Sequence, residues 1–309
     1  MKLIAKMKYP AKYFAFVRIA LGIFFLFNYI YLFPYAIELF SSAGLLGGFG
    51  PLTTNTLPNI LAHNNTPQFI QLYFLVLIAA SATLALGIYR QPSALILWYG
   101  LASLLNINPY IINPAFAYVG WLLLAMAVIP LGEPYTLLRK HNSNWEMPKL
   151  VVVGAWLVFG ASYTVSGITK LVSPSWVNGE TLDVLLNSTM ANGWFIADWA
   201  RLLLPLSISH ILTWGILWLE ILCLPLCFWQ LTRKYTWLLL TAAHVGILLI
   251  LNIGFISVGM LVFHLFLFNT AWWPKIHIRV FGNLAKLSQK IIRQLNNGPV
   301  GIFLNALKP

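Results

Sequence analysis

A few polar side chains occur inside segments of this sequence that are otherwise strongly apolar. Lys170 ends a long apolar run, and Tyr163 and Ser166 precede it at spacings that place all three residues on one face of a helix. Glu220 and His244 lie within two later apolar runs. Ionisable groups in such segments are costly and are usually functional. A lysine in this setting can act as a base if its amine is neutral, or it can anchor a helix end at an interface.

Glu220 is the hardest of these residues to explain by structure alone. A carboxyl group in a bilayer must be protonated or paired with a base or with water. A contact with His244 or with Arg201 would satisfy it, and the sequence leaves both partners open. His244 and His264 are each as consistent with an interhelical hydrogen bond as with a chemical role.

Motifs for metals and nucleotides are missing from the sequence. No H-x-x-H, H-E-x-x-H or C-x-x-C spacing occurs, and there is no glycine pattern for binding phosphates. Cys223 and Cys227 stand four residues apart in an apolar run, where we interpret them as small hydrophobic residues. The sequence therefore predicts no metal site.

Composition decides the broad class. Of 309 residues, 60% are hydrophobic and 8% are charged, and the mean hydropathy is +0.79; a soluble domain carries roughly 25% charged residues. These values predict an all-α polytopic membrane protein with one transmembrane domain over residues 1–274. The net charge of +12 suggests basic cytoplasmic loops beside anionic membrane lipid, and not nucleic acid, as its counterpart.

Eight apolar runs are candidates for crossing the membrane, which needs about 20 residues of helix. The last two runs are nearly continuous, with a junction at Asn252–Gly254. The eight predicted spans are Phe14–Phe40, Gln68–Tyr89, Ala94–Ile112, Ala115–Leu131, Leu150–Thr169, Leu203–Gln230, Thr236–Leu251 and Ile253–Trp272.

The basic residues predict the orientation, because they favour the cytoplasmic side. With both termini in the cytoplasm, all but three of the 19 lysines and arginines fall inside. Arg18 lies within the first span near its inner end, where its side chain can extend to the interface. Lys170 and Arg201 fall outside. After the spans, residues 275–309 place apolar side chains on one helical face and basic side chains on another, which predicts an amphipathic helix on the inner leaflet.

The predicted outer surface is rich in tryptophan. Trp176, Trp194 and Trp199 occur in the segment that follows Lys170. Tryptophans at this depth are typical of an aromatic belt, and they would also suit the wall of a site for a flat apolar ring.

Two segments carry a resemblance to a known family. Gly167–Leu171, followed after a short spacer by Trp176–Gly179, is similar to the catalytic-lysine segment of the vitamin K-dependent γ-glutamyl carboxylases. His244, eight residues and then Ile253-Gly254 resembles the H-x8-I-G pattern of the same enzymes.

Other segments resemble bacterial members of the wider HTTM (horizontally transferred transmembrane) family. These are Asn106–Pro109, Ile129–Gly132 and the pair Leu219-Glu220. Together the similar segments extend over the whole predicted transmembrane domain, which suggests a bacterial inner-membrane protein of this fold.

The resemblance implies a lyase-class chemistry that uses a reduced naphthoquinone of the vitamin K or menaquinone type. In that family a neutral lysine deprotonates the hydroquinone, whose anion reacts with oxygen. The resulting alkoxide removes a γ-proton from a peptidyl glutamate, CO2 traps the carbanion, and the quinone leaves as its epoxide.

The resemblance also implies roles for residues of this chain. Lys170 would be the base, with Gly167 leaving room for the ring. Asn106 and Asn108 would donate hydrogen bonds to a quinone oxygen. The further residues expected to line the site are Tyr163, Ser166, Trp176, Glu220 and His244.

Departures from the family pattern keep other functions open. Thr169-Lys170 stands where the animal enzymes have two lysines, and their large lumenal domain for substrate recognition has no counterpart in these 309 residues. One alternative is a maturation or immunity factor for a secreted peptide, acting with a partner protein. Another is a transporter or membrane scaffold without covalent chemistry, although the two halves show no convincing internal repeat.

Overall fold

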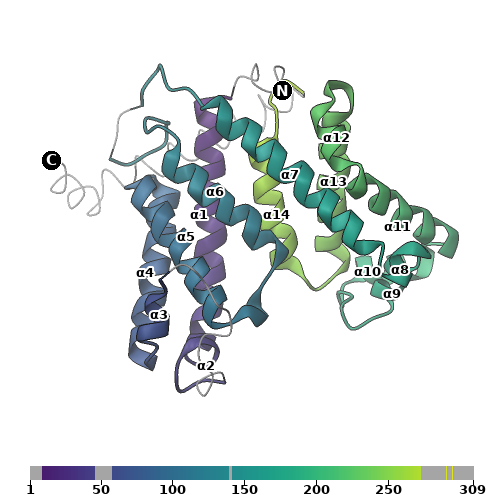
Figure 1. The fold of residues 1–309 in the computed structure, drawn as a ribbon, viewed down its shortest axis with the longest axis horizontal. Helices are drawn as coiled ribbons and strands as arrows, with labels where there is room; N and C mark the ends of the chain where they lie inside the picture. Colours follow the sequence, from purple (N-terminus) through teal and green to yellow (C-terminus); the bar gives the residue numbers. More distant parts are fainter. Residues whose placement is uncertain (1–8, 46–57, 139–140, 273–289, 291–293, 295–309) are drawn as a thin grey trace. The chain divides into compact units, whose positions relative to one another are not determined.

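The computed structural model describes residues 9–45, 58–138, 141–272, 290 and 294. Within these residues all regular structure is helical apart from one isolated bridge between Ala191 and Leu251. This confirms the predicted all-α class. The predicted tail at 275–309 lies outside the described residues, except for 290 and 294. The described chain falls into two compact units, residues 9–147 and Pro148–Trp272 (Figure 1).

The first unit is a bundle in which sequential helices pack side by side: α1 on α4, α4 on α5, and α5 on α6. Proline at the first turn of α4 and α6 suits a position that needs no N–H donor. Gly87, in a left-handed conformation, ends α4. The elements are α1 (Ala11–Leu32), η2 (Phe33–Tyr35), α2 (Ala36–Phe40), α3 (Ile60–His63), α4 (Pro67–Leu86), α5 (Arg90–Ile107), η3 (Pro109–Ile111) and α6 (Pro114–Val128).

The second unit is organised around α7, which packs against α11 and α12, while α13 packs against α12 and α14. Three short helices follow α7 and lead into α11. The elements are α7 (Lys149–Lys170), α8 (Pro174–Val177), α9 (Thr181–Leu186), α10 (Phe195–Leu203), α11 (Leu206–Ile221), α12 (Cys223–Phe228), α13 (Gln230–Ile250) and α14 (Gly254–Leu267).

Three of the described helices are long and apolar enough to cross a membrane: Ala11–Phe40, Pro67–Leu86 and Lys149–Lys170. A fourth crossing is possible if α10 and α11, which are bent by 109° at their junction, act together. The other predicted spans contain helices that are shorter or less apolar. The 15 residues of α6, for example, rise only about 22 Å against a hydrocarbon core of about 30 Å.

The predicted span Leu203–Gln230 is not one continuous helix. It breaks at Pro205, between α10 and α11, and again at Leu222, between α11 and α12. Proline explains both breaks, because it lacks an N–H donor and its ring collides with the carbonyl four residues earlier. For Pro225 that carbonyl belongs to Ile221, which is the last residue of α11.

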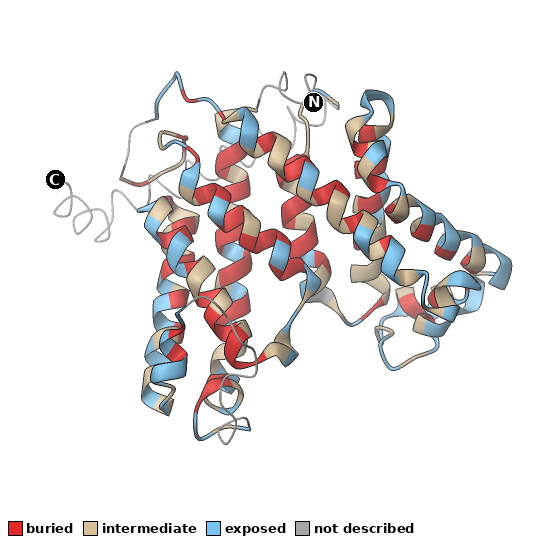
Figure 2. Cartoon of the chain, in the orientation of Figure 1, coloured by how far each residue is buried: buried red, intermediate tan, exposed pale blue. Residues whose placement is uncertain are grey.

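The outward faces of the helices are apolar. Figure 2 shows buried and exposed positions alternating around α1, α4 and α7. Several exposed positions carry large apolar side chains, among them Phe27, Leu72 and Val165. Extended exposed apolar surface of this kind marks a site of membrane or protein contact, which agrees with helices that face lipid.

Candidate functional site

Lys170 and Glu220 form a close ion pair in the second unit. Nζ of Lys170 lies 2.6 Å from Oε1 and 2.5 Å from Oε2 of Glu220. The lysine side chain is 22% exposed and the glutamate side chain 8%. A buried carboxylate is destabilising unless a positive charge or hydrogen-bond donors compensate it. Lys170 supplies the compensating positive charge for Glu220. Neither His244 nor Arg201, the partners that the sequence suggested, fills this role; Arg201 pairs with Asp198 instead.

Two further groups complete the surroundings of the pair. The hydroxyl of Ser166, one turn before Lys170, donates to Oε2 of Glu220 at 3.1 Å. The ring of Trp176 lies over the ammonium, with Nζ 4.3 Å from the ring centroid, which is within cation–π range. A turn closed by the bond from Ser173 N to Lys170 O brings α8, and with it Trp176, back over the end of α7. The ammonium is thus held between an anion and an aromatic face.

The kink after α11 also contributes to the position of Glu220. Because Pro225 has no N–H, the carbonyl of Ile221 lacks its helical partner, and Leu224 N, which a continuous helix would direct to the carbonyl of Glu220, binds Thr164 instead. The Thr164 hydroxyl on α7 shares its single proton between the carbonyls of Glu220 and Ile221, at 3.3 and 3.2 Å, and accepts from Leu224 N at 3.0 Å. The broken end of α11 is therefore fastened to α7 one and a half turns from Lys170.

Gly167 does not leave space for a ring, as the sequence had suggested. A Cβ atom at Gly167 would lie 2.6 Å from the backbone nitrogen of Ile221. Gly160 is similarly close to Leu224, at 3.0 Å. These glycines instead allow α7 to approach α11 and α12 closely, which is the usual role of small residues between membrane helices. That close approach lets a short serine hydroxyl reach Glu220.

A second polar group lies two turns back along α7. The hydroxyl of Tyr163 is 2.6 Å from Nε2 of His244 on α13 and 2.9 Å from Nε2 of His264 on α14. Nδ1 of His264 lies 2.8 Å from the Thr241 hydroxyl. All three ring-bearing residues are buried. Tyr163 therefore ties together the three helices α7, α13 and α14.

The two polar groups share one face of α7. Tyr163, Ser166 and Lys170 are spaced three and four residues apart, so they follow one side of the helix over about 10 Å. The sequence predicted this alignment. It did not predict that two histidines converge on Tyr163, because that depends on how α13 and α14 pack.

Asn106 and Asn108 lie in the first unit, and their amides serve the structure there. Oδ1 of Asn106 accepts a 2.7 Å hydrogen bond from Asn59 Nδ2. Asn108 donates to the carbonyl of Leu39 at 3.1 Å and caps η3 through Tyr110 N. Both residues thus hold segments of residues 9–147 together.

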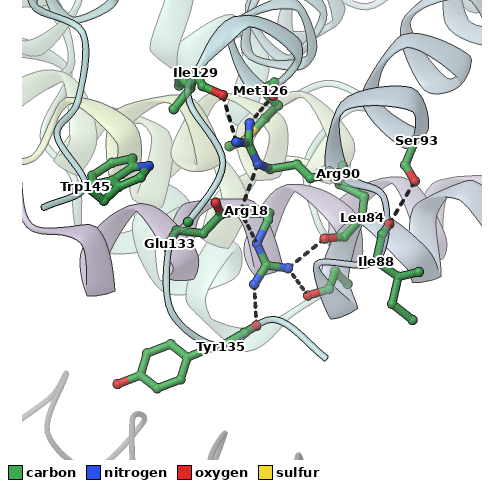
Figure 3. Close-up of polar contacts among 12 residues, drawn as sticks. Arg18, Leu84, Ile88, Arg90, Ser93, Met126, Ile129, Glu133, Tyr135 and Trp145 are labelled. Carbon is green, nitrogen blue, oxygen red and sulfur yellow. Dashed lines mark hydrogen bonds and ion pairs between the residues drawn. The ribbon is translucent and has the colours of Figure 1, made fainter. Parts of the chain in front are cut away.

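The first unit contains a buried charge cluster that the sequence did not reveal (Figure 3). Oε1 of Glu133 lies 2.8 Å from Nε of Arg90 and 3.4 Å from Nε of Arg18. The three side chains are at most 1% exposed. Arg18 therefore does not extend to the membrane interface, as its place in the sequence had suggested. Its partner Glu133 lies 115 positions away, and no local signal in the sequence links the two residues.

The two guanidinium groups of this cluster also bind carbonyls at helix ends. Arg18 donates to the carbonyls of Leu84, Ala85 and Tyr135. Arg90 donates to Met126, Ile129 and Pro130. Because the last carbonyls of a helix lack partners and carry partial negative charge, each arginine caps the carboxyl end of one helix, α4 or α6. The cluster is a structural clamp.

Comparisons with protein-family models, with curated proteins and with solved structures find no match to this chain. In the second unit, one side of α7 is lined by groups of several chemical types. They are an amine, a carboxyl group, an indole ring and a pair of imidazoles joined through a hydroxyl group. Groups of these types can accept and pass on protons.

Proposed function

We propose that this chain is an HTTM-type membrane enzyme that deprotonates a reduced naphthoquinone at Lys170, in the manner of the vitamin K-dependent γ-glutamyl carboxylases. The observation that carries the proposal is the Lys170–Glu220 pair beneath the Trp176 ring. The pair and the ring bring an amine, a carboxyl group and an aromatic face together at the end of α7. The combination of a proton-accepting pair and a flat aromatic wall suits an aromatic substrate with an acidic hydroxyl group.

The residues at the end of α7 fit such a group. Trp176 supplies an aromatic wall beside Nζ, and the exposed part of Lys170 offers an amine to a hydroxyl group that reaches it. The neighbouring exposed side chains, Val172 and Val177, are apolar. When bound, the hydroquinone would supply the reaction with oxygen that yields a strong base and the quinone epoxide.

Glu220 would give Lys170 a way to become a base. The charged pair is costly in a poorly hydrated setting, and moving one proton from Nζ to the carboxylate converts it to an amine and a carboxylic acid. The 2.5 Å separation makes this transfer short. Ser166 can continue to donate to the carboxyl group afterwards. The neutral amine could then take the hydroxyl proton of a ligand.

The topology that goes with this proposal has eight spans and both termini in the cytoplasm. Its support is the distribution of lysines and arginines, which puts Lys170 and Trp176 on the outer side. The substrate of the strong base would then be an exported molecule, such as a peptide with an accessible glutamate.

The test is a product assay on purified protein in detergent. Reduced menaquinone or vitamin K is mixed with oxygen, and epoxide is followed by chromatography for the wild type and for Lys170→Ala. Lys149→Ala is the matched control, because Lys149 is an exposed lysine at the opposite end of the same helix. We expect epoxide from the wild type and the control and at least about a hundredfold less from Lys170→Ala.

The opposite result is equally informative. A well-folded wild type that neither forms epoxide nor binds the hydroquinone would overturn the enzyme proposal. The pair would then be an interfacial anchor in a peptide-maturation factor or scaffold.

A further inference from the structure

The hydrogen bonds around Tyr163 form a chain whose direction is fixed at one end. The Thr241 hydroxyl lies 2.6 Å from the carbonyl of Trp237, which can only accept, so Thr241 donates its single proton there. The same hydroxyl lies 2.8 Å from Nδ1 of His264. Because its proton is already used, Thr241 must accept, and Nδ1 of His264 must carry a hydrogen.

That assignment passes along the chain. A buried imidazole with no carboxylate partner is neutral, so Nε2 of His264 has a lone pair and accepts from the Tyr163 hydroxyl at 2.9 Å. Tyr163 then has no second proton for His244. The 2.6 Å contact between them is therefore a bond donated by Nε2 of His244 to the tyrosine oxygen.

The chain ends in one open acceptor. With its hydrogen on Nε2, neutral His244 keeps a lone pair on Nδ1. This atom is buried and has no hydrogen-bond partner among the residues that the structure describes. The whole residue is only 9% exposed. A buried acceptor that is left unsatisfied costs about 1–3 kcal/mol. His244 is on α13 and contacts Tyr163, which lies two turns before Lys170 on α7.

We infer that Nδ1 of His244 accepts a hydrogen bond from a hydroxyl group of the bound ligand, and that this contact makes the protein selective for the reduced form of an aromatic ring over its oxidised form. This inference rests on the function proposed above. A hydroquinone carries O–H donors that can bind Nδ1 of His244. A quinone carries only acceptors, so the lone pairs of its oxygen and of Nδ1 would repel each other. Tyr163, His264 and Thr241 are positioning residues, since they hold the imidazole in the accepting tautomer.

Two substitutions at one position separate this role from that of a structural histidine. In His244→Asn the amide reaches the place of Nδ1, and in His244→Gln it reaches the place of Nε2. The glutamine thus keeps the bond to Tyr163 and loses the open acceptor, while the asparagine keeps the acceptor. The ligands are menadione and its reduced form, titrated under anaerobic conditions by calorimetry, so that no turnover takes place.

We expect the wild type to bind the reduced form about tenfold more tightly than the oxidised form, as one well-formed hydrogen bond allows. The ratio of the two affinities should remain near the wild-type value in His244→Asn and fall to about one in His244→Gln. A wild type that binds both forms equally, a His244→Gln variant that keeps the preference, or an asparagine variant that loses it would each overturn the inference and leave the proposed function standing. A wild type that binds neither form would remove the proposed function itself.

Nitrogen NMR on histidine-labelled protein supplies a readout that does not depend on any variant folding. The spectrum should show one imidazole with its hydrogen on Nε2 and an unprotonated Nδ1 that shifts only when the reduced ligand is added. The opposite tautomer at His244 would contradict the inference.

Discussion

Lys170 and Glu220 are 50 positions apart in the sequence, yet Nζ of the lysine lies within 2.6 Å of both carboxylate oxygens. The pair joins the end of α7 to the end of α11 at the point where Pro225 interrupts the helix. It is partly buried, so it combines a requirement of the fold with a group able to exchange protons. Separating these two roles requires measurements of stability as well as of activity.

Replacing Lys170 by methionine should destabilise the protein by about 2–3 kcal/mol. The change leaves the Glu220 carboxylate buried without a counter-charge, and the partial exposure of the lysine reduces the loss below that of a fully buried pair. Thermal unfolding in detergent measures the effect, with Lys149→Met as the control. The double variant Lys170→Met, Glu220→Met should regain most of the loss. If it is less stable than Lys170→Met, the carboxylate is not what the lysine stabilises.

Replacing Glu133 by glutamine should destabilise the first unit by about 3–5 kcal/mol. The change leaves the guanidinium groups of Arg18 and Arg90 together in the interior without a negative charge. Chemical unfolding, followed by tryptophan fluorescence, provides the measurement. Glu146→Gln is the control, because Glu146 is exposed. Equal stabilities for the two variants would mean that the hydrogen bonds to backbone carbonyls stabilise the two arginines without help from Glu133.

The helices were predictable from the sequence because apolar runs, prolines and glycines are local signals. Each of the eight predicted runs overlaps at least one helix, and α7 differs from its predicted span Leu150–Thr169 by one residue at each end. The two breaks in Leu203–Gln230 were missed although Pro205 and Pro225 signalled them. The run was predicted as one helix because it is almost continuously apolar, although a proline inside a helix interrupts its hydrogen bonds.

The pairings were not predictable, since they depend on helices that meet in three dimensions. From the sequence, His244 and Arg201 were the suggested partners of Glu220, and nothing local pointed to Lys170, which forms the pair. Gly167 shows the same limit. A glycine beside a candidate catalytic lysine suggests room for a ligand, but the backbone of Ile221 fills that space.

Replacing Gly167 by alanine should lower stability by about 1–3 kcal/mol, because the added methyl group would lie 2.6 Å from Ile221 N and force the helices apart. Gly246→Ala on α13 is the matched control. Apart from the adjoining backbone of its own helix, no atom lies within 4 Å of a Cβ added there, so alanine should stabilise the helix by about 0.5–1 kcal/mol. The two variants are compared by thermal unfolding in one detergent. Similar values at both sites would contradict the close packing of α7 on α11.

The proposed orientation makes a prediction at the two ends of α7. This helix has 22 residues, which rise about 33 Å and are enough to cross the hydrocarbon core. Val172, just beyond Lys170, is 87% exposed, and Ser143, in the segment before α7, is also exposed. A membrane-impermeant maleimide added to intact cells should therefore label Val172→Cys but not Ser143→Cys.

Background labelling should be low, because the native Cys223 and Cys227 are fully buried. Both new cysteines should react once the cells are permeabilised, which shows that each is accessible. Labelling of Ser143→Cys alone in intact cells would invert the orientation and put Lys170 in the cytoplasm. Peptides awaiting export, and not exported ones, would then be the substrates within reach of its base. Labelling of both positions in intact cells would show that α7 does not cross the membrane, and the eight-span topology would have to be abandoned.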